Sequence, residues 1–133
     1  MSHHRELINP PGLHPTPGFS HIAVTHGTKV VYFAGQVGIA QDFSLVAGDL
    51  EGQTIGAMRN LEVAMDAVGV TWDDIVRRTI YTLHPTEYEL ITRAIDEVTG
   101  GAAHPPQTIL GVTGLAVPGL LIEIECTAVV AGH

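Results

Sequence analysis

Residues 49–68 carry an unbroken apolar stripe at helical spacing. Its members recur at steps of three and four: Leu50, Thr54, Met58, Leu61, Met65 and Val68. Such spacing places them on one face of an α-helix. Asp49 is expected to cap the start of this helix, and Gly69 to end it. Because an apolar helix face has to be buried against another layer of structure, the rest of the chain must supply that layer.

Apolar runs of strand length stand on both sides of this helix. They occupy five ranges: 21–26, 29–34, 75–83, 108–112 and 120–130. Gly27 and Thr28, between the first two ranges, predict a β-hairpin. Arg77, Arg78 and Thr79 interrupt the apolar residues of the third range. The second layer is therefore expected to be a β-sheet.

Other segments complete the predicted order of elements. A second helix is expected over 86–98, ended by Gly100-Gly101, and residues 71–74 look like the capping sequence of a short helical turn. Residues 1–18 hold four prolines and two glycines and are predicted to be an irregular arm. Residues 19–133 are then expected to form a single domain. The order ββαβαββ indicates an α+β fold, but it does not fix how the strands pair.

The charge balance argues against a polyanionic partner. Six basic and fourteen acidic residues give a formal net charge of -8, which repels phosphate backbones. There is no run of Lys or Arg, and aromatic residues for base stacking make up only 5%. No window approaches the roughly 18 apolar residues of a membrane span, and residues 1–12 do not look like a signal peptide. We therefore expect a cytoplasmic protein that binds neither nucleic acid nor membrane.

The cysteine and the histidines favour neither a metal site nor a nucleophile. Cys126 is the single cysteine, and its apolar surroundings predict a buried, inert thiol. His21 and His26 flank one predicted strand, but their spacing of five directs the side chains to opposite faces. No HxH or HxxxH spacing occurs among the eight histidines, so we expect no bound metal.

Several short motifs follow one another at characteristic intervals. They read Pro17-Gly-Phe-Ser20, Val31-Tyr-Phe-Ala-Gly-Gln36, Gln53-Thr54 with Asn60-Leu61, Pro105-Pro-Gln-Thr-Ile-Leu-Gly-Val112 with Leu115, and Ile122-Glu-Ile-Glu125. Each motif alone is unspecific. The ordered set resembles the RidA-like family, also named YjgF/YER057c/UK114 or endoribonuclease L-PSP, over nearly the whole chain from Phe19 onward.

The resemblance implies a chorismate-mutase-like α+β fold with both helices on one face of the sheet. It also implies a homotrimer with a small-molecule cleft at each subunit interface, and it implies no cofactor. Typical active members hydrolyse a 2-imino or enamino acid to a keto acid and ammonia. In them, an arginine of the C-terminal motif grips the substrate carboxylate, and a glutamate is implicated in positioning the attacking water.

This chain has Gln107 at the arginine position of that motif. An amide gives one good hydrogen bond to a carboxylate where arginine gives two charge-assisted ones, so binding of a 2-imino acid should weaken by about tenfold or more. Phe19 and Ala34 stand where the family has a tyrosine and a serine. We therefore expect a more apolar cleft that attracts anions less, with Ile109 as a further ligand contact.

Two residues of the family pattern are retained and leave the question of catalysis open. Glu123 matches the glutamate that positions the water, although a strand carboxylate without function would look the same. Gly35 matches a glycine whose backbone lies close to the ligand, although it could equally be a simple strand end. His104, three residues before Gln107, could replace part of the lost hydrogen bonding or be an ordinary loop histidine.

Two hypotheses of function follow. One is a Rid-type hydrolase or deaminase with altered substrate preference, in which Glu123 holds a water and Gln107 orients the ligand. The alternative is a non-catalytic trimer that binds a small metabolite in the interface cleft, motivated by the polar groups lost at Phe19, Ala34 and Gln107. A third, the ribonuclease activity in the family's name, is disfavoured by the net charge of -8.

Overall fold

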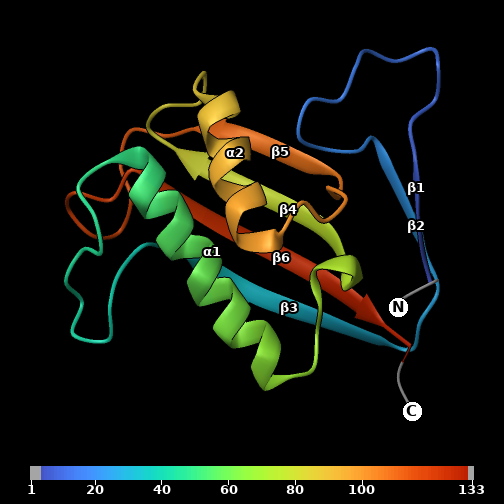
Figure 1. Ribbon diagram of the computed structural model, residues 1–133, viewed down its shortest axis with the longest axis horizontal. Coiled ribbons are helices and arrows are strands. Elements are labelled where there is room, and N and C mark those ends of the chain that lie inside the picture. Colours follow the sequence, from blue (N-terminus) through green and yellow to red (C-terminus); the bar gives the residue numbers. More distant parts are fainter. Residues whose placement is uncertain (1–3, 132–133) are drawn as a thin grey trace.

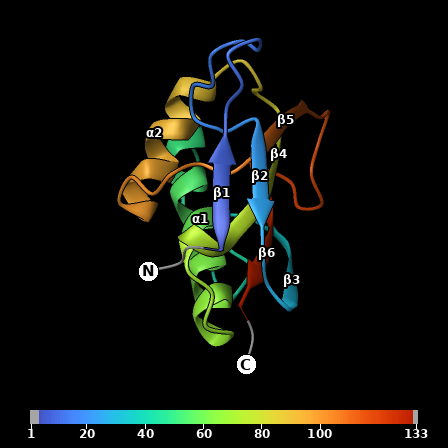
Figure 2. The same cartoon turned by 90° about the vertical axis from the view of Figure 1, so that its right-hand side faces the viewer.

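The computed structural model describes residues 4–131. The elements in chain order are β1 (Arg5–Ile8), β2 (Ile22–Thr25), β3 (Lys29–Gln36), α1 (Leu50–Ala67), the 3₁₀ turn η1 (Trp72–Asp74), β4 (Ile75–Thr82), α2 (Tyr88–Thr99), β5 (Gln107–Gly111) and β6 (Ile122–Val130). Strands β3, β6, β4 and β5 lie side by side in this order, and β1 and β2 form a separate small sheet. Both helices cover one face of the larger sheet (Figure 1), and the small sheet stands at one end of the molecule (Figure 2). The α+β fold with two helices on one face is thereby confirmed.

The central strands fix which side chains meet the helices. β6 pairs antiparallel with both β3 and β4, and β5 runs parallel to β4. The β6 residues directed toward the helices are buried: Ile122, Ile124, Cys126 and Ala128. Because side chains alternate along a strand, Glu123, Glu125 and Thr127 point to the other side of the sheet. We call that side, which no helix covers, the open face.

The helix predicted from the apolar stripe forms as α1. Its stripe residues are buried: Leu50, Thr54, Met58, Leu61 and Met65. The helix begins after Asp49 and ends just before Gly69, which has a φ of +70°. Val68, the last residue of the predicted stripe, lies at the C-cap and is 55% exposed. The second helix is also confirmed as α2, and Gly100 ends it in the left-handed conformation.

The predicted hairpin of residues 21–26 and 29–34 is wrong. β2 pairs with β1, whereas β3 pairs along its length with β6. Gly27 lies against the end of β6: a Cβ on it would stand 2.5 Å from the Val130 carbonyl oxygen, to which the Thr28 N–H donates at 3.1 Å. The glycine therefore lets the chain pass from one sheet to the other. An isolated two-stranded hairpin is only marginally stable, so β3 is stabilised more by pairing with β6, the long central strand, than by pairing with β2.

The prediction that residues 1–18 are irregular is wrong for Arg5–Ile8. These residues form β1 and pair antiparallel with β2. The prolines begin only at Pro10, and they break regular structure only from there on. Residues 10–19, which we call the proline loop, contain no helix or strand. The domain boundary before residue 19 stays a prediction.

Burial explains the state of the cysteine. The Cys126 side chain lies in the core, which confirms the predicted burial, and burial raises the pKa of its thiol to about 12. Within residues 4–131, no helix is long and apolar enough to cross a membrane. In the same range, no three side chains of His, Cys, Asp or Glu are grouped so that they could hold a metal ion.

Candidate functional site

A cavity of about 520 Å³ lies between the proline loop, the N-terminal end of α2 and the edge strand β5. Its walls are largely apolar: Pro15, Pro17, Phe19, Pro85, Tyr88 and Ile109. Gln107 and His14 supply the other lining side chains. The volume is within the range of small-molecule sites, about 300–1,000 Å³. Three predicted ligand contacts, Phe19, Gln107 and Ile109, therefore share one cavity.

Gln107 and Ile109 face the cavity because of the position of β5 in the sheet. Parallel pairing with β4 sets Gln107 beside Arg78 and Ile109 beside Ile80. Arg78 and Ile80 are both buried on the helix side of the sheet. Paired residues share a face, so Gln107 and Ile109 also point to the helix side. There, Tyr88 at the start of α2 forms the opposite wall.

Arg78 is a candidate functional residue that was not predicted. Its side chain is buried, and its guanidinium donates from Nε to Gln107 Oε1 at 2.5 Å and from Nη2 to the Gly18 carbonyl at 3.0 Å. Burial lowers the pKa of Arg78 to about 10, so the group stays charged at neutral pH. The sequence contains a signal for it. An arginine in phase with Ile80 and Thr82 along a strand is directed toward the same buried side.

His104 and Asp96 continue this line of polar contacts. Arg78 Nη2 donates to His104 Nδ1 at 2.9 Å, and His104 Nε2 lies 2.8 Å from Asp96 Oδ1. Because a guanidinium has only donors, Nδ1 must accept, and Nε2 carries the proton that is donated to Asp96. Burial and then the charge of Arg78 lower the pKa of His104, although Asp96 opposes them. His104 therefore supports Arg78, and it is not among the side chains that line the cavity.

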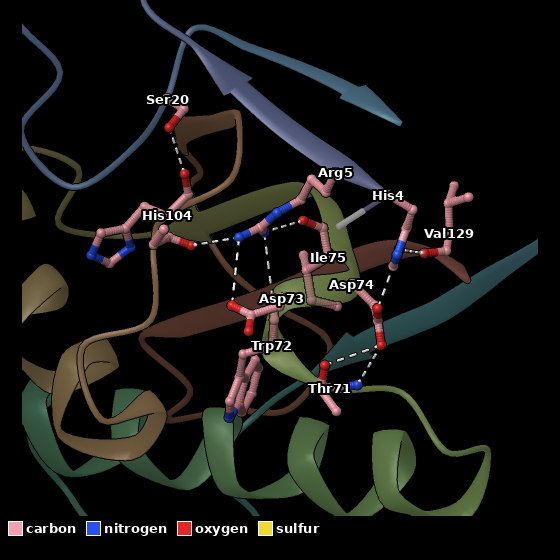
Figure 3. A network of polar contacts seen from close by, with 11 residues as sticks. His4, Arg5, Ser20, Thr71, Trp72, Asp73, Asp74, Ile75, His104 and Val129 are labelled. Carbon is pink, nitrogen blue, oxygen red and sulfur yellow. Dashed lines mark hydrogen bonds and ion pairs between the residues drawn. The ribbon is translucent and has the colours of Figure 1, made fainter. Parts of the chain in front are cut away.

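The two neighbours of Phe19, Gly18 and Ser20, are both held in place. The hydroxyl of Ser20 donates to the His104 carbonyl at 2.7 Å (Figure 3). Gly18 has a φ of +83°, and a Cβ on it would stand 2.5 Å from the Thr92 hydroxyl of α2. Glycine alone accepts both this backbone conformation and this close approach. The ring of Phe19 is thereby held at the cavity wall.

Arg5 of β1 ties the small sheet to the rest of the molecule (Figure 3). Its guanidinium donates from Nη1 to the carbonyls of Ile75 at 2.7 Å and Trp72 at 3.4 Å, and from Nη2 to that of Ala103 at 3.3 Å. The carboxylate of Asp73 lies 3.7 Å from Nη2. Burial lowers the pKa of Arg5. These contacts, which we call the Arg5 clasp, join β1 to η1, β4 and the segment before β5.

His4 adds a second attachment beside Arg5. Its Nε2 lies 2.6 Å from the Val129 carbonyl oxygen and 3.2 Å from Asp74 Oδ1 (Figure 3). The other oxygen of Asp74 accepts from the Thr71 N–H at 2.8 Å and from its hydroxyl at 3.1 Å. This capping box confirms the short helical turn predicted from residues 71–74. His4 thus joins the residue before β1 to η1 and to β6.

Glu123, Gly35 and Ala34 lie apart from the cavity. Glu123 belongs to the β6 residues of the open face. Gly35 lies directly against it, because a Cβ on Gly35 would collide with the Glu123 carboxylate. Ala34 is exposed in the irregular stretch of β3 next to Gly35. Within one chain, these three predicted site residues therefore lie on the open face of the sheet, whereas Gln107 lies on the helix side.

Other polar side chains of β4, β5 and β6 also lie on the open face. The Tyr81 hydroxyl donates to the Glu125 carboxylate, and this hydrogen bond raises the pKa of Tyr81. Arg77 Nη2 donates to Thr108 Oγ1 at 2.5 Å. Arg77 and its neighbour Arg78 therefore serve opposite faces of the sheet, as the alternation along a strand requires.

Known proteins with the same fold support the sequence resemblance. The family model for endoribonuclease L-PSP matches residues 11–130. The RutC family protein YjgH of Escherichia coli K12 is 31% identical over 107 residues, which cover 80% of this chain and 79% of YjgH. YyfB of Yersinia pestis, a solved structure of unknown function from the Rid family, is 34% identical with a TM-score of 0.88, covering 96% of this chain and 99% of YyfB. Rv2704 of Mycobacterium tuberculosis is 27% identical with a TM-score of 0.66, covering 95% of this chain and 99% of Rv2704. The chain therefore belongs to the YjgF/RidA family, whose model carries the name endoribonuclease L-PSP.

Proposed function

We propose that this protein binds a small molecule with an apolar or aromatic body in the cavity between the proline loop, α2 and β5. The observation that carries this proposal is the lining of the cavity. Phe19, Ile109 and several prolines surround a volume of about 520 Å³, to which Gln107 contributes an amide. Small-molecule sites commonly combine apolar walls with a few polar groups that fix the orientation of the ligand.

Three probes of this chemical class test the proposal: ethylbenzene, acetophenone and benzoate. Binding is followed by ligand-observed NMR and by thermal shift, since a ligand at 100 times its Kd stabilises the folded state by about 2.7 kcal/mol. Ile109→Trp should fill the cavity and abolish binding. Val63→Trp is the control, because Val63 lies on α1, is 70% exposed and does not line the cavity. If none of the probes binds the wild-type protein at millimolar concentration, the proposal is wrong.

The contact between Gly35 and Glu123 favours a second function, hydrolysis of an imine, or of an enamine through its imine tautomer. Water would add to the carbon of the C=N bond, and breakage of the C–N bond would give a carbonyl compound and ammonia. Glu123 would accept the proton of the attacking water and return it to the leaving nitrogen. Because Gln107 and Glu123 lie on opposite faces of one chain, a substrate touching both would need Glu123 from a second copy.

Ammonia release from a panel of freshly generated imines tests this second function. Glu123→Gln should abolish the release, and Glu125→Gln, on the same strand and the same face, is the control. If Glu123→Gln releases ammonia at the wild-type rate, Glu123 is not catalytic.

We also propose that the chain assembles as a homotrimer in which the open face is covered. Large apolar side chains of this face are exposed in the single chain: Tyr32 at 79%, Val30 at 53% and Leu110 at 43%. Apolar side chains gathered on one sheet face are typical of a surface that a partner covers. Light scattering should give three times the mass of the chain, and a monomer would contradict this proposal.

RNA is not the ligand that we propose, despite the name of the family model. The net charge of -8 opposes the approach of a phosphate backbone. The open face adds the carboxylates of Glu123 and Glu125 to this repulsion.

A further inference from the structure

We infer that Arg78 is a positioning residue that sets the orientation of the Gln107 amide, with its oxygen toward Arg78 and its N–H donors toward the cavity. The cavity would then select ligands that offer a hydrogen-bond acceptor, such as a carbonyl or carboxylate oxygen. This specificity rests on the proposed use of the cavity as a ligand site. The orientation of the amide is independent of that proposal, because it follows from contacts within the protein.

The orientation follows from the chemistry of the two groups. A guanidinium carries only donors, so the amide atom that meets it has to be the oxygen. Arg78 Nε lies 2.5 Å from Gln107 Oε1. The nitrogen of the amide is on the other side of the same carbon, and Gln107 is a lining residue of the cavity. We therefore expect the side chain to turn its N–H donors, and not its oxygen, toward the cavity.

Arg78 cannot easily release the amide, because it is held from two other directions. Its Nη2 donates to the Gly18 carbonyl at 3.0 Å and to His104 Nδ1 at 2.9 Å. The residue is only 4% exposed, so no water shell is available to its charge if these bonds break. His104 is itself held by Asp96 at 2.8 Å. The amide is thus the last member of a line of contacts that begins on α2.

The charge of Arg78 strengthens the preference for an acceptor. Among the ion pairs of residues 4–131, none includes Arg78, so Asp96 is reached only through the neutral ring of His104. A cation that bonds the amide oxygen polarises the amide and makes its N–H groups better donors. A negatively charged or carbonyl oxygen beside them would also be attracted by the guanidinium itself, one amide group away.

The first experiment reads the amide directly by side-chain NMR. The Gln107 NH₂ signals are assigned from their loss in Gln107→Met. Arg78→Met should shift these signals strongly, and Arg78→Lys, which keeps a charged donor, should restore part of the shift. Arg77→Met is the matched control, because Arg77 is the adjacent residue on the open face and bonds Thr108. If Arg78→Met leaves the Gln107 signals unchanged, the inference is overturned.

A measurement on the wild-type protein keeps the inference testable if Arg78→Met does not fold. The Arg78 Nε–H should give a resolved signal that exchanges slowly with solvent, because it is buried and bonded to Gln107. A signal that exchanges as fast as that of an exposed arginine would overturn the inference.

The second experiment reads selectivity, which a merely structural role of Arg78 would leave unchanged. Acetophenone carries a neutral acceptor, benzoate a charged one, and ethylbenzene none. In the wild type, acetophenone should bind about tenfold more tightly than ethylbenzene, as expected for one good hydrogen bond. Arg78→Met should bring this ratio close to one, and in a Gln107→Met background it should have no further effect. An unchanged ratio in Arg78→Met would refute the selectivity, and benzoate shows whether charge adds to it.

The two experiments separate failure of the proposed function from failure of this inference. Absence of binding by all three probes would refute the ligand site and, with it, the selectivity. The amide signals would still decide whether Arg78 orients Gln107.

Discussion

The Arg5 clasp should account for a measurable share of the stability of this protein. Arg5→Met removes the guanidinium and keeps an unbranched apolar side chain of similar length. Three backbone carbonyls, of Trp72, Ile75 and Ala103, then lose the hydrogen bond from Arg5, although that of Trp72 keeps the one from the Ile75 N–H. The Arg5 side chain is only 5% exposed, so water cannot easily replace it.

The magnitude follows from the geometry of each contact. The bond to Ile75 at 2.7 Å has a charged donor and is worth about 1.5–3 kcal/mol. The two bonds at 3.3 and 3.4 Å are weaker, and the pair with Asp73, which is 53% exposed, adds less than about 1 kcal/mol. We expect the free energy of unfolding to fall by about 2–3 kcal/mol, because methionine retains part of the apolar contact. For a chain of 133 residues, this lowers Tm by roughly 6–12 °C.

Thermal melts followed by circular dichroism measure this change. Amide hydrogen exchange should show in addition that β1 and β2 open more often than the four-stranded sheet. Arg59→Met is the control, because Arg59 makes, within residues 4–131, only an exposed pair with Glu62 on α1, worth about 0.2–0.5 kcal/mol. If Arg5→Met lowers Tm as little as Arg59→Met does, the clasp does not stabilise the fold and the reasoning is refuted.

Three further predictions concern the open face, the contacts of His104 with Arg78 and Asp96, and the core. Gly35→Ala should displace the Glu123 carboxylate but cost less than about 1 kcal/mol, because the atoms in the way belong to a flexible, partly exposed side chain. Gly114→Ala, which has open space around its Cβ position, is the control. Unchanged Glu123 side-chain NMR signals in Gly35→Ala would contradict the contact. Because the pKa of His104 is lowered in the folded state, the unfolded chain binds its proton more readily, so stability should fall as the pH drops below about 6.5. His104→Gln should flatten this slope in urea melts, and an unchanged slope would assign it to other groups. Cys126, whose thiol pKa is raised to about 12 by burial, should react with Ellman's reagent only on unfolding, and rapid reaction of the native protein would show that the core opens.

The helices were predictable because their signals are local. The stripe of α1 and its limits at Asp49 and Gly69 can be read from one stretch of sequence. Strand pairing depends instead on segments far apart in the chain. β2 was predicted to pair with the next strand, but it pairs with β1, and the partner of β3 is β6, close to the C-terminus. No local pattern distinguishes these partners, since any two strands of matching length can form a ladder.

The site was predictable only in part, for the same reason. The family resemblance brought Phe19, Gln107 and Ile109 together, and the structure places all three on one cavity. The resemblance could not show Arg78, because its contact with Gln107 joins residues 29 positions apart through the register of β4 and β5. The expectation of a site that attracts anions less rested on Phe19, Ala34 and Gln107 and did not include Arg78. The guanidinium on the adjacent strand supplies a positive charge behind the amide. The homotrimer, the cytoplasmic location and the role of Glu123 stay predictions.

Because the proline loop continues from β1, ligand affinity in the proposed site should depend on how firmly β1 is docked. The loop supplies one wall of the cavity, and it follows directly on a strand whose docking depends on Arg5. Ligand binding and the docking of β1 are then coupled equilibria. A change that weakens the docking of β1 weakens ligand binding, and a bound ligand stabilises the docked strand by the same coupling free energy. A bulky fusion before residue 4, or proteolysis between residue 4 and β1, should therefore lower ligand affinity without touching the cavity.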